Sequence, residues 1–213
     1  QPQRTYTPSE IAFSSEGSHV PLEMARQKMS SPSEWESFHK RLASFGKGSG
    51  LYESIDIRRL GKGEADPFQV RVKTMGPPVN LVDVGYGVSQ VLPIIYQLEQ
   101  TRSNDVFLLQ QPEVHLHPRA QAELGSLIVD LTLQRTDTLY VVETHSDYII
   151  DRVRMQVASG KLDPRNVTII FFDRGEHEVT ASNIYLTDSG EIDNAPPNFR
   201  SFFLEEQARL LGV

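Results

Sequence analysis

Amide, carboxylate and imidazole side chains gather in one short stretch of the chain, 105–118, which reads DVFLLQQPEVHLHP. Its side chains that could do chemistry are Gln110, Gln111, Glu113, His115 and His117. They follow the apolar run Val106–Leu109, whose continuity is typical of a strand buried on both faces of a parallel sheet. Because ligands of open α/β sheets bind beyond the carboxyl ends of the strands, these side chains are expected at a ligand-binding edge.

Two further stretches place small or polar residues where an apolar segment meets a helix. The first, 83–90, reads DVGYGVSQ and contributes Gly85, Gly87, Ser89 and Gln90. Helix N-termini leave amide groups unpaired and carry a partial positive charge, so this stretch is a candidate anion site. The second, 141–147, reads VVETHSD and places His145 after another apolar strand. Each stretch alone also fits an ordinary turn between a strand and a helix.

In this order, the three stretches resemble the signature, Walker B and switch-histidine segments of ABC-type ATPases. The likeness is to the OLD-like and SMC-like branch, and within it to bacterial AAA-family ATPases. In those proteins the Walker B segment reads acid-Gln-Pro-Glu followed by His-Leu-His-Pro. The resemblance covers roughly the last two thirds of the chain.

The resemblance implies a role for each group of residues. The signature group, Gly85, Gly87, Ser89 and Gln90, would contact the γ-phosphate of a nucleotide held by the other subunit. His145 would donate a hydrogen bond to the γ-phosphate and hold the attacking water in line. His115 and His117 match the D-loop position at the subunit interface, and His117 is counted among the nucleotide-binding candidates.

The two glutamines depart from the family pattern. Gln110 stands where the family has an acidic residue near Mg²⁺, and Gln111 stands where ABC ATPases have the hydrolytic glutamate. An amide can orient a water molecule but cannot accept its proton, and Mg²⁺ prefers carboxylate oxygens and waters. Gln110 is the candidate metal residue, and the catalytic candidates are Gln110, Gln111, Glu113 and His145. A naturally weakened site and an engineered trap both fit, and Glu113 also fits a solvated turn residue.

No phosphate-binding loop is found in the chain. The stretch 45–50, FGKGSG, does not have the spacing G-x-x-x-x-G-K-[ST], no apolar strand precedes it, and no helix is expected to begin after its serine. The resemblance therefore implies that the Walker A loop and the adenine contacts come from a preceding lobe. A zinc site at His115, His117 and His145 is an alternative interpretation of the histidines.

Composition excludes several classes of protein. The 213 residues are enough for one domain or a large lobe with its own core. A net charge of −7, from 28 acidic and 21 basic residues, does not support nucleic-acid binding, although a local basic patch stays open. The chain has no cysteine, no signal peptide core and no apolar run near the roughly 20 residues that span a bilayer. A cytoplasmic protein without a membrane segment is expected.

Periodicity predicts the elements that position these residues. Residues 1–50 are expected to form an irregular lead-in and one helix near 34–45, begun by a capping box of Ser33 and Glu36. Half-buried strands are expected at 51–60 and 68–73, helices at 88–99, 118–134 and 146–158, and buried strands at 106–109, 139–142 and 167–172. The three buried strands alternate along the chain with the helices at 118–134 and 146–158, which is the pattern of a parallel sheet. An antiparallel strand at 179–186 follows, and then a terminal helix, 198–211, docked through Phe202, Phe203, Ala208 and Leu211.

The expected fold class is α/β, with 51–213 as the C-terminal lobe of an ABC-type P-loop NTPase head: a mainly parallel sheet flanked by helices, with an antiparallel strand pair. The resemblance implies an ATPase that uses ATP and Mg²⁺ at a head-to-head homodimer interface and couples nucleotide state to assembly, in bacterial antiviral defence. Its partners would be a Walker A lobe and an effector such as a nuclease. The alternative is a hydrolysis-deficient scaffold or sensor for that effector.

Overall fold

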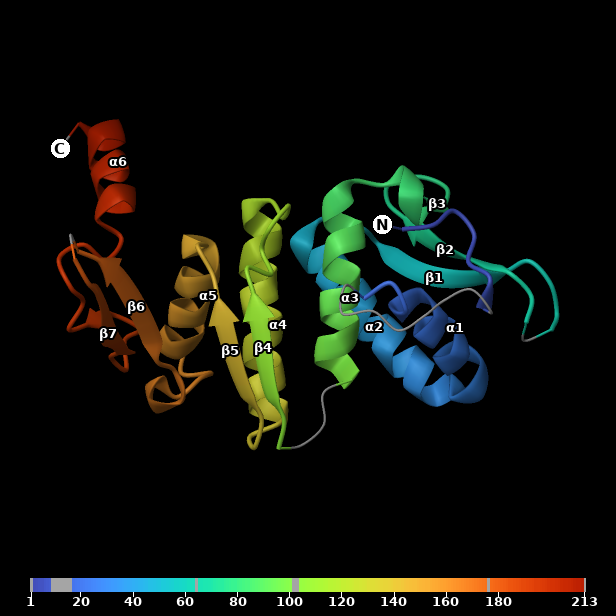
Figure 1. Ribbon diagram of the computed structural model, residues 1–213, viewed down its shortest axis with the longest axis horizontal. Coiled ribbons are helices and arrows are strands. Elements are labelled where there is room, and N and C mark those ends of the chain that lie inside the picture. The colour runs from blue at the N-terminus through green and yellow to red at the C-terminus, as the bar shows by residue number, and fades with distance from the viewer. Residues whose placement is uncertain (1, 9–16, 64, 101–103, 176, 213) are drawn as a thin grey trace. The chain divides into compact units, whose positions relative to one another are not determined.

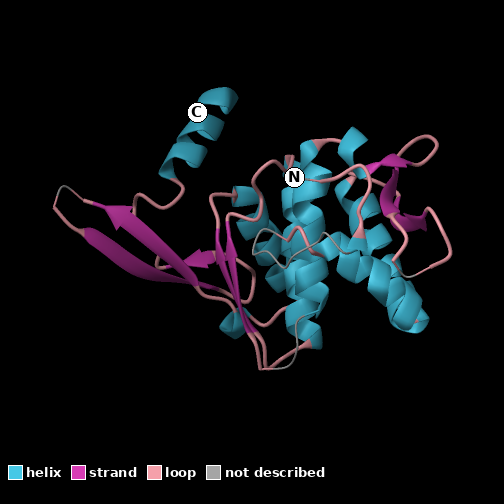
Figure 2. Ribbon diagram, turned by 45° about the vertical axis from the view of Figure 1, so that its right-hand side comes forward, coloured by secondary structure: helices cyan, strands magenta, loops and turns pink. Residues whose placement is uncertain are grey.

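The computed structural model describes residues 2–8, 17–63, 65–100, 104–175 and 177–212, with the side chains of 202–204 outside the description. The chain divides into two compact units, Gln1–Arg152 and Val153–Val213. Figure 1 labels their helices and strands, and Figure 2 colours the same ribbon by secondary structure. Within the first unit, helices pack beside an antiparallel sheet and beside a parallel strand pair, as a mixed α/β fold requires. The predicted fold class is confirmed, while the lobe boundary at residue 50 stays a prediction.

Four helices of the first unit supply much of its core: α1 (Val20–Ser30), α2 (Pro32–Ser49), α3 (Tyr86–Gln100) and α4 (Pro118–Gln134). Their buried faces follow the helical period of the sequence. The predicted apolar side chains of α2 are all buried, namely Trp35, Phe38, Leu42 and Phe45. Those predicted for α3 are buried too: Val88, Val91, Leu92 and Ile95. No helix in the described part of the chain is long and apolar enough to cross a membrane.

The start of α2 differs from the predicted capping box. The helix begins at Pro32, and its N-cap is Ser31, whose side chain makes no capping hydrogen bond. Proline at the first helical position costs no hydrogen bond and already has a helical φ, so it can start the helix before Ser33. The assignment of Ser33 as N-cap was therefore wrong.

The end of α2 also extends past the predicted boundary, through the glycines of the 45–50 stretch. A Cβ atom on Gly46 would collide with the ring of Tyr52, and one on Gly48 would collide with the carboxylate of Glu123. These glycines therefore permit close packing inside the helix. Gly50, at φ +77°, ends the helix in the left-handed conformation that glycine adopts readily. The stretch is a helix terminus, which confirms that it is no phosphate loop.

An antiparallel sheet is formed by β1 (Ser54–Arg59), β2 (Phe68–Lys73) and β3 (Val79–Asn80), in that order. Its inner face is fully apolar and buried, and consists of Ile55, Ile57, Phe68, Val70 and Val72. The intervening residues point outward and are polar, as the alternation in the sequence predicts. The short 3₁₀ helix η2 (Leu81–Asp83) then leads toward α3.

The central strand pair consists of β4 (Val106–Gln110) and β5 (Leu139–Glu143), which run parallel and are connected by α4. Helix α5 (Asp147–Ala158) follows β5. Prediction and structure differ in how the strand pair is covered. Leu109 is buried and Phe107 packs against the core, but the other face is open: Val106, Leu108, Leu139 and Val141 are 63%, 74%, 57% and 46% exposed. Burial on both faces was wrong for this chain, because its described helices cover one face of the pair.

The second unit contains η3 (Pro164–Asn166), β6 (Ile169–Arg174), β7 (Val179–Leu186), β8 (Ile192–Asp193) and α6 (Ser201–Leu211). Strand β6 pairs antiparallel with β7, because the short turn between them permits only a hairpin. The predicted strand near 167–172 is confirmed as β6, while its membership of the parallel sheet stays a prediction. On α6, Leu211 is 78% exposed, and docking of this helix on the body stays a prediction. The predicted contacts of Phe202 and Phe203 lie outside the described side chains.

Candidate functional site

The candidate site lies at the carboxyl ends of β4 and β5. Gln110 and Glu143 are register partners in the parallel ladder, so their Cα atoms face each other at the last position of each strand. The backbone N–H of Gln111 donates to the carbonyl of Glu143 at 2.8 Å. The side-chain amide nitrogen of Gln111 lies 3.4 Å from Oε1 of Glu143. The two predicted glutamines therefore adjoin a carboxylate contributed by the next strand.

A tight turn follows Gln111 and leads into α4. The backbone N–H of Val114 donates to the Gln111 carbonyl at 3.2 Å, and that of Leu116 donates to the Glu113 carbonyl at 2.9 Å. Gln111 and His115 have positive φ values, 44° and 69°. Positive φ is uncommon for non-glycine residues, so this turn holds a strained backbone between the strand and the helix.

His117 is the N-cap residue of α4, but its side chain makes no capping hydrogen bond. Its imidazole is exposed, as is that of His115. Both rings are therefore accessible at the surface next to the turn, and a nucleotide-binding role for His117 stays a prediction.

Glu113 is buried beneath this turn, with 7% of the residue exposed. Its Oε1 accepts a hydrogen bond from the backbone N–H of His145 at 2.8 Å, while its Oε2 is buried with no hydrogen-bond partner in the structure. The interpretation of Glu113 as a solvated turn residue was therefore wrong. The carboxylate joins the turn after β4 to the loop after β5, and a buried carboxylate needs such partners.

His145 is exposed in the loop between β5 and α5, and the following residue holds that loop in place. The Ser146 hydroxyl accepts from the backbone N–H of Ile149 at 3.2 Å, which confirms the predicted helix cap. The same hydroxyl donates to Oε1 of Gln121 on α4 at 2.6 Å, and Nε2 of Gln121 donates to the Leu116 carbonyl at 2.7 Å. Two hydrogen-bonded connections therefore position His145 relative to the turn after β4.

The glycines of the 83–90 stretch have different surroundings. A Cβ atom on Gly87 would lie 2.7 Å from the carbonyl oxygen of His115, so α3 can approach the turn after β4 only with glycine there. The ring of Tyr86 packs edge-on against His115, with 4.7 Å between ring centroids. Gly85 is exposed and a Cβ atom on it would meet nothing within 4 Å. Gly85, rather than Gly87, therefore presents open backbone to solvent.

Ser89 and Gln90 complete the first turn of α3. The Ser89 hydroxyl donates to the carbonyl of Tyr86 at 2.8 Å, which is a local helix contact, and both side chains are half-buried. Ahead of the helix, Asp83 accepts two hydrogen bonds from Arg4, at 2.6 and 3.1 Å. This ion pair attaches the N-terminal segment to the start of the candidate anion site.

The structure thus brings all three predicted stretches together at the carboxyl ends of β4 and β5, but it does not support the zinc site. The described residues contain no group of three or more His, Cys, Asp or Glu side chains that could hold a metal ion, so a zinc site at His115, His117 and His145 was wrong. Glu143 was missed by sequence reasoning. The sequence feature that could have identified Glu143 is its position at the end of the apolar strand, just before His145. A parallel register between the two strands brings Glu143 opposite Gln110.

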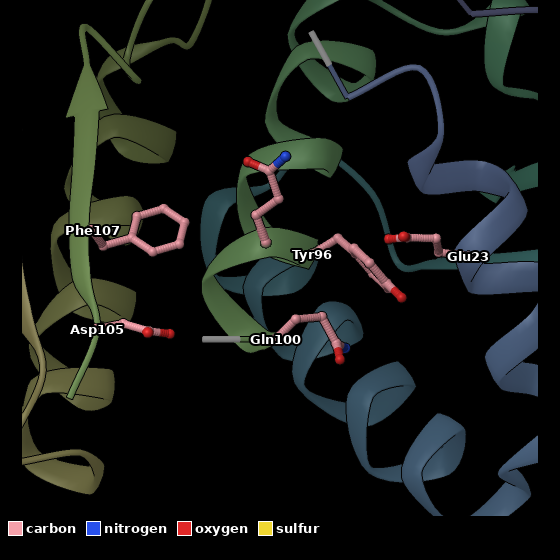
Figure 3. Close-up of a pocket in the computed structure, with 6 residues that line it drawn as sticks. Glu23, Tyr96, Gln100, Asp105 and Phe107 are labelled. Atoms are coloured by element: carbon pink, nitrogen blue, oxygen red, sulfur yellow. The ribbon is translucent and has the colours of Figure 1, made fainter. Parts of the chain in front are cut away.

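A shallow cavity of about 280 Å³ lies elsewhere in the first unit, at the amino end of β4 (Figure 3). Its lining residues are Glu23, Tyr96, Gln97, Gln100, Asp105 and Phe107. Burial, and then the negative charge of Glu23, raise the pKa of Tyr96 to about 12. The cavity is at the opposite end of β4 from Gln110 and Gln111, so it is not part of the candidate site.

Comparison with protein families gives a match over most of the first unit. The profile of the family described as "AAA domain, putative AbiEii toxin, Type IV TA system" matches residues 6–151. A comparison with curated proteins gave no match.

Solved structures of SMC heads share the fold at low sequence identity. An Smc head bound to the C-winged helix domain of ScpA has a TM-score of 0.54 at 12% identity, covering 78% of this chain and 50% of its own. An Smc head domain with an extended coiled coil, bound to the C-terminal domain of ScpA and derived from Pyrococcus furiosus, has a TM-score of 0.52 at 12% sequence identity. The match covers 90% of this chain and 42% of that one. This chain spans half or less of the length of both. A structure from work on the ATP-driven dimerization and DNA-stimulated activation of SMC ATPases has a TM-score of 0.47 at 11% sequence identity. The match covers 82% of this chain and 96% of that one.

Proposed function

Because the chain belongs to this family of AAA domains, which are nucleotide-binding ATPases, we propose that it forms part of an ABC-type ATPase head that binds and hydrolyses ATP. The observation that carries the proposal is the convergence of the three stretches at one edge of the first unit. Glu113 bonds to the backbone of His145, and Gly87 lies against the carbonyl of His115. Residues far apart in sequence thereby surround the ends of β4 and β5, where ligands bind in open α/β sheets.

Each group at this edge has a task in the proposed reaction. The exposed imidazole of His145 donates a hydrogen bond to the γ-phosphate. The side chain of Gln111 orients the attacking water. The exposed backbone around Gly85, at the N-terminus of α3, faces a phosphate of the nucleotide on a second head. Positioning and charge stabilisation account for most of the catalysis of phosphoryl transfer, and these groups supply both.

The donor atoms at the edge suit a hard cation. Mg²⁺ in nucleotide sites is held by a few protein oxygens together with phosphate oxygens and waters. The side-chain oxygen of Gln110, at the last position of β4, is an oxygen of this kind. When bound, Mg²⁺ neutralises negative charge that develops on the phosphates.

We further propose that a lobe carrying a Walker A loop completes the site and that two heads associate around ATP. The sequence contains no G-x-x-x-x-G-K-[ST], so the cradle for the β-phosphate must be supplied by another segment. The open apolar face of β4 and β5, formed by Val106, Leu108, Leu139 and Val141, supports a covering lobe, because contiguous exposed apolar side chains mark interaction surfaces.

The biological setting proposed here is cytoplasmic antiviral defence in bacteria, within the OLD-like branch, with an effector protein such as a nuclease as partner. Its support is the family description, which names a toxin of a TA system. The net charge of −7 does not favour nucleic acid as the primary ligand.

A second function is favoured by the amides at positions 110 and 111. Neither Gln110 nor Gln111 can accept a proton from water, which suits a nucleotide-responsive scaffold or sensor that turns over ATP slowly or not at all. Such a protein would still bind ATP and change its assembly state.

The test is a measurement of ATP binding and phosphate release by the complete protein and its His145→Ala variant. The proposal expects turnover to fall more than nucleotide affinity, because the imidazole contacts the transferred phosphoryl group. His177→Ala, at another exposed histidine in the β6–β7 hairpin, is the matched control. Equal losses of turnover and affinity, or no loss in either, would return His145 to a structural role. ATP binding without any phosphate release would select the scaffold.

A further inference from the structure

One carboxylate at the candidate site has no assigned task. Glu143 is the last residue of β5, and its side chain is exposed beside the side chains of Gln110 and Gln111. Its Oε1 lies 3.4 Å from Nε2 of Gln111. Glu143 is thus the carboxylate that the ends of β4 and β5 present to solvent.

The neighbouring groups cannot perform the step that a carboxylate performs. Hydrolysis of a phosphoanhydride is assisted by a base that removes a proton from the attacking water, and an amide is not such a base. Gln111 therefore can orient the water but cannot deprotonate it. The amide of Gln111 also lies close enough to Glu143 for one water molecule to contact both side chains.

Other acidic residues near the site are already engaged. Glu113 is buried, and its Oε1 is bonded to the backbone of His145. Asp83 is held by two hydrogen bonds from Arg4. A base must be able to reach the water in the site, and neither of these carboxylates presents a free, exposed oxygen at the ends of the two strands.

We propose that Glu143 is the general base of the ATPase reaction, so that the catalytic carboxylate stands on β5 rather than on β4. Glu143 accepts one proton from a water molecule oriented by Gln111. The water oxygen forms a bond to the γ-phosphorus, and the bond from that phosphorus to the β,γ-bridging oxygen breaks. ADP leaves with the electron pair, and phosphate carries the former water oxygen. This inference rests on the proposed function.

The decisive variant is Glu143→Gln in the complete protein, because it keeps the shape of an exposed side chain and removes its basicity. We expect the single-turnover rate of phosphate release to fall by roughly 10²- to 10⁴-fold, the usual contribution of general-base catalysis. ATP affinity should change by less than about threefold, because the base acts in the transition state. Any ATP-dependent dimer should persist longer in sedimentation experiments.

A double variant exchanges the amide of Gln111 and the carboxylate of Glu143, whose side chains lie 3.4 Å apart. The double variant Gln111→Glu/Glu143→Gln should release phosphate at least about tenfold faster than the single variant Glu143→Gln. Glu178→Gln, at an exposed glutamate of the β6–β7 hairpin, is the control and should release phosphate at the unaltered rate. Circular dichroism of each variant verifies that the fold is retained.

The outcomes separate this inference from the proposed function. Normal hydrolysis by Glu143→Gln, or a parallel loss of ATP affinity and turnover without rescue by the double variant, would overturn the role of Glu143 and leave the ATPase assignment standing. An unaltered protein that binds ATP but releases no phosphate would overturn the role of Glu143 in favour of the scaffold. An unaltered protein that binds no ATP would overturn both proposals.

Discussion

The two sheets of the first unit are covered in opposite ways. The antiparallel sheet β1–β2–β3 has one apolar face, and that face is completely buried, as with Phe68 and Val70 at 0% exposure. The parallel pair β4–β5 is apolar on both faces, yet Leu108 on its outer face is 74% exposed. The first sheet is finished by this chain's own helices, whereas the second has an apolar surface for which the described residues supply no cover.

This difference is already written in the residue patterns of the strands. β1 and β2 alternate apolar and polar side chains, which suits a sheet with one solvated face. β4 and β5 carry consecutive apolar side chains, which suits strands covered on both faces. The candidate site lies at the end of the second sheet, so the incomplete part of the structure is also the part that would bind the ligand.

The largest effect is expected in the finished sheet. Phe68→Ala should lower the free energy of unfolding by about 3–5 kcal/mol, because it removes a large buried ring and leaves a cavity. Urea unfolding followed by the fluorescence of Trp35, the single tryptophan and a buried residue of the same unit, measures it. A loss below about 1 kcal/mol would contradict the view that this sheet is complete.

A smaller effect is expected where α3 meets the end of the open sheet. Gly87→Ala should cost about 1–3 kcal/mol, since its Cβ atom would press on the His115 carbonyl and force a backbone shift. Gly85→Ala is the matched control two residues earlier, and should stay within about 0.5 kcal/mol because its Cβ atom meets nothing. The same urea titration compares them, and equal effects at the two glycines would refute the assigned contact.

A third effect depends on pH and concerns Tyr96 in the helical core. Its pKa is raised to about 12 by burial and by Glu23, above the usual value of 10.0. The stability that results is complete below pH 10 and is lost as the pH rises toward 12, because the unfolded chain gives up the proton first. Tyr96→Phe should therefore lose less stability than the unaltered chain between pH 10 and pH 12, as measured by urea unfolding at each pH. Parallel loss in both proteins would show that Tyr96 does not cause the alkaline sensitivity.

The smallest effect is expected on the open face. Leu108→Ala should change the stability of this chain by no more than about 0.5 kcal/mol, because the side chain is exposed. In a complete protein whose further lobe covers this face, the same substitution should cost about 2–5 kcal/mol. Unfolding of both proteins tests the contrast, and a small change in both would mean that no lobe covers Leu108.

Elements with a strong local signal were predicted well from the sequence. Helix α4 runs from Pro118 to Gln134, the range expected from its starting proline and its regular leucines. The end of α2 was misjudged because Gly46 reads as a helix terminator, whereas the ring of Tyr52 requires a glycine there. Local propensity cannot show such a contact, since the partner follows the helix and folds back on it.

The candidate site was predicted in part. The three stretches that resemble ATPase segments do converge, and Ser146 caps α5 as expected. The burial of Glu113 and the position of Glu143 were missed for a common reason. Both depend on contacts between the segments of β4 and β5: the register sets Glu143 opposite Gln110, and the Glu113 carboxylate bonds to the backbone of His145. Such contacts are set by packing between strands, which no single stretch reveals.

The backbone at Gln111 has a consequence for engineering this protein. Its φ of +44° is a conformation in which glycine or asparagine is less strained than glutamine. Glycine at this position would remove the amide that lies beside Glu143, and asparagine would withdraw it by one methylene group. Position 111 is therefore a point of trade-off between stability and activity, where a search for thermostable variants would select against the proposed chemistry.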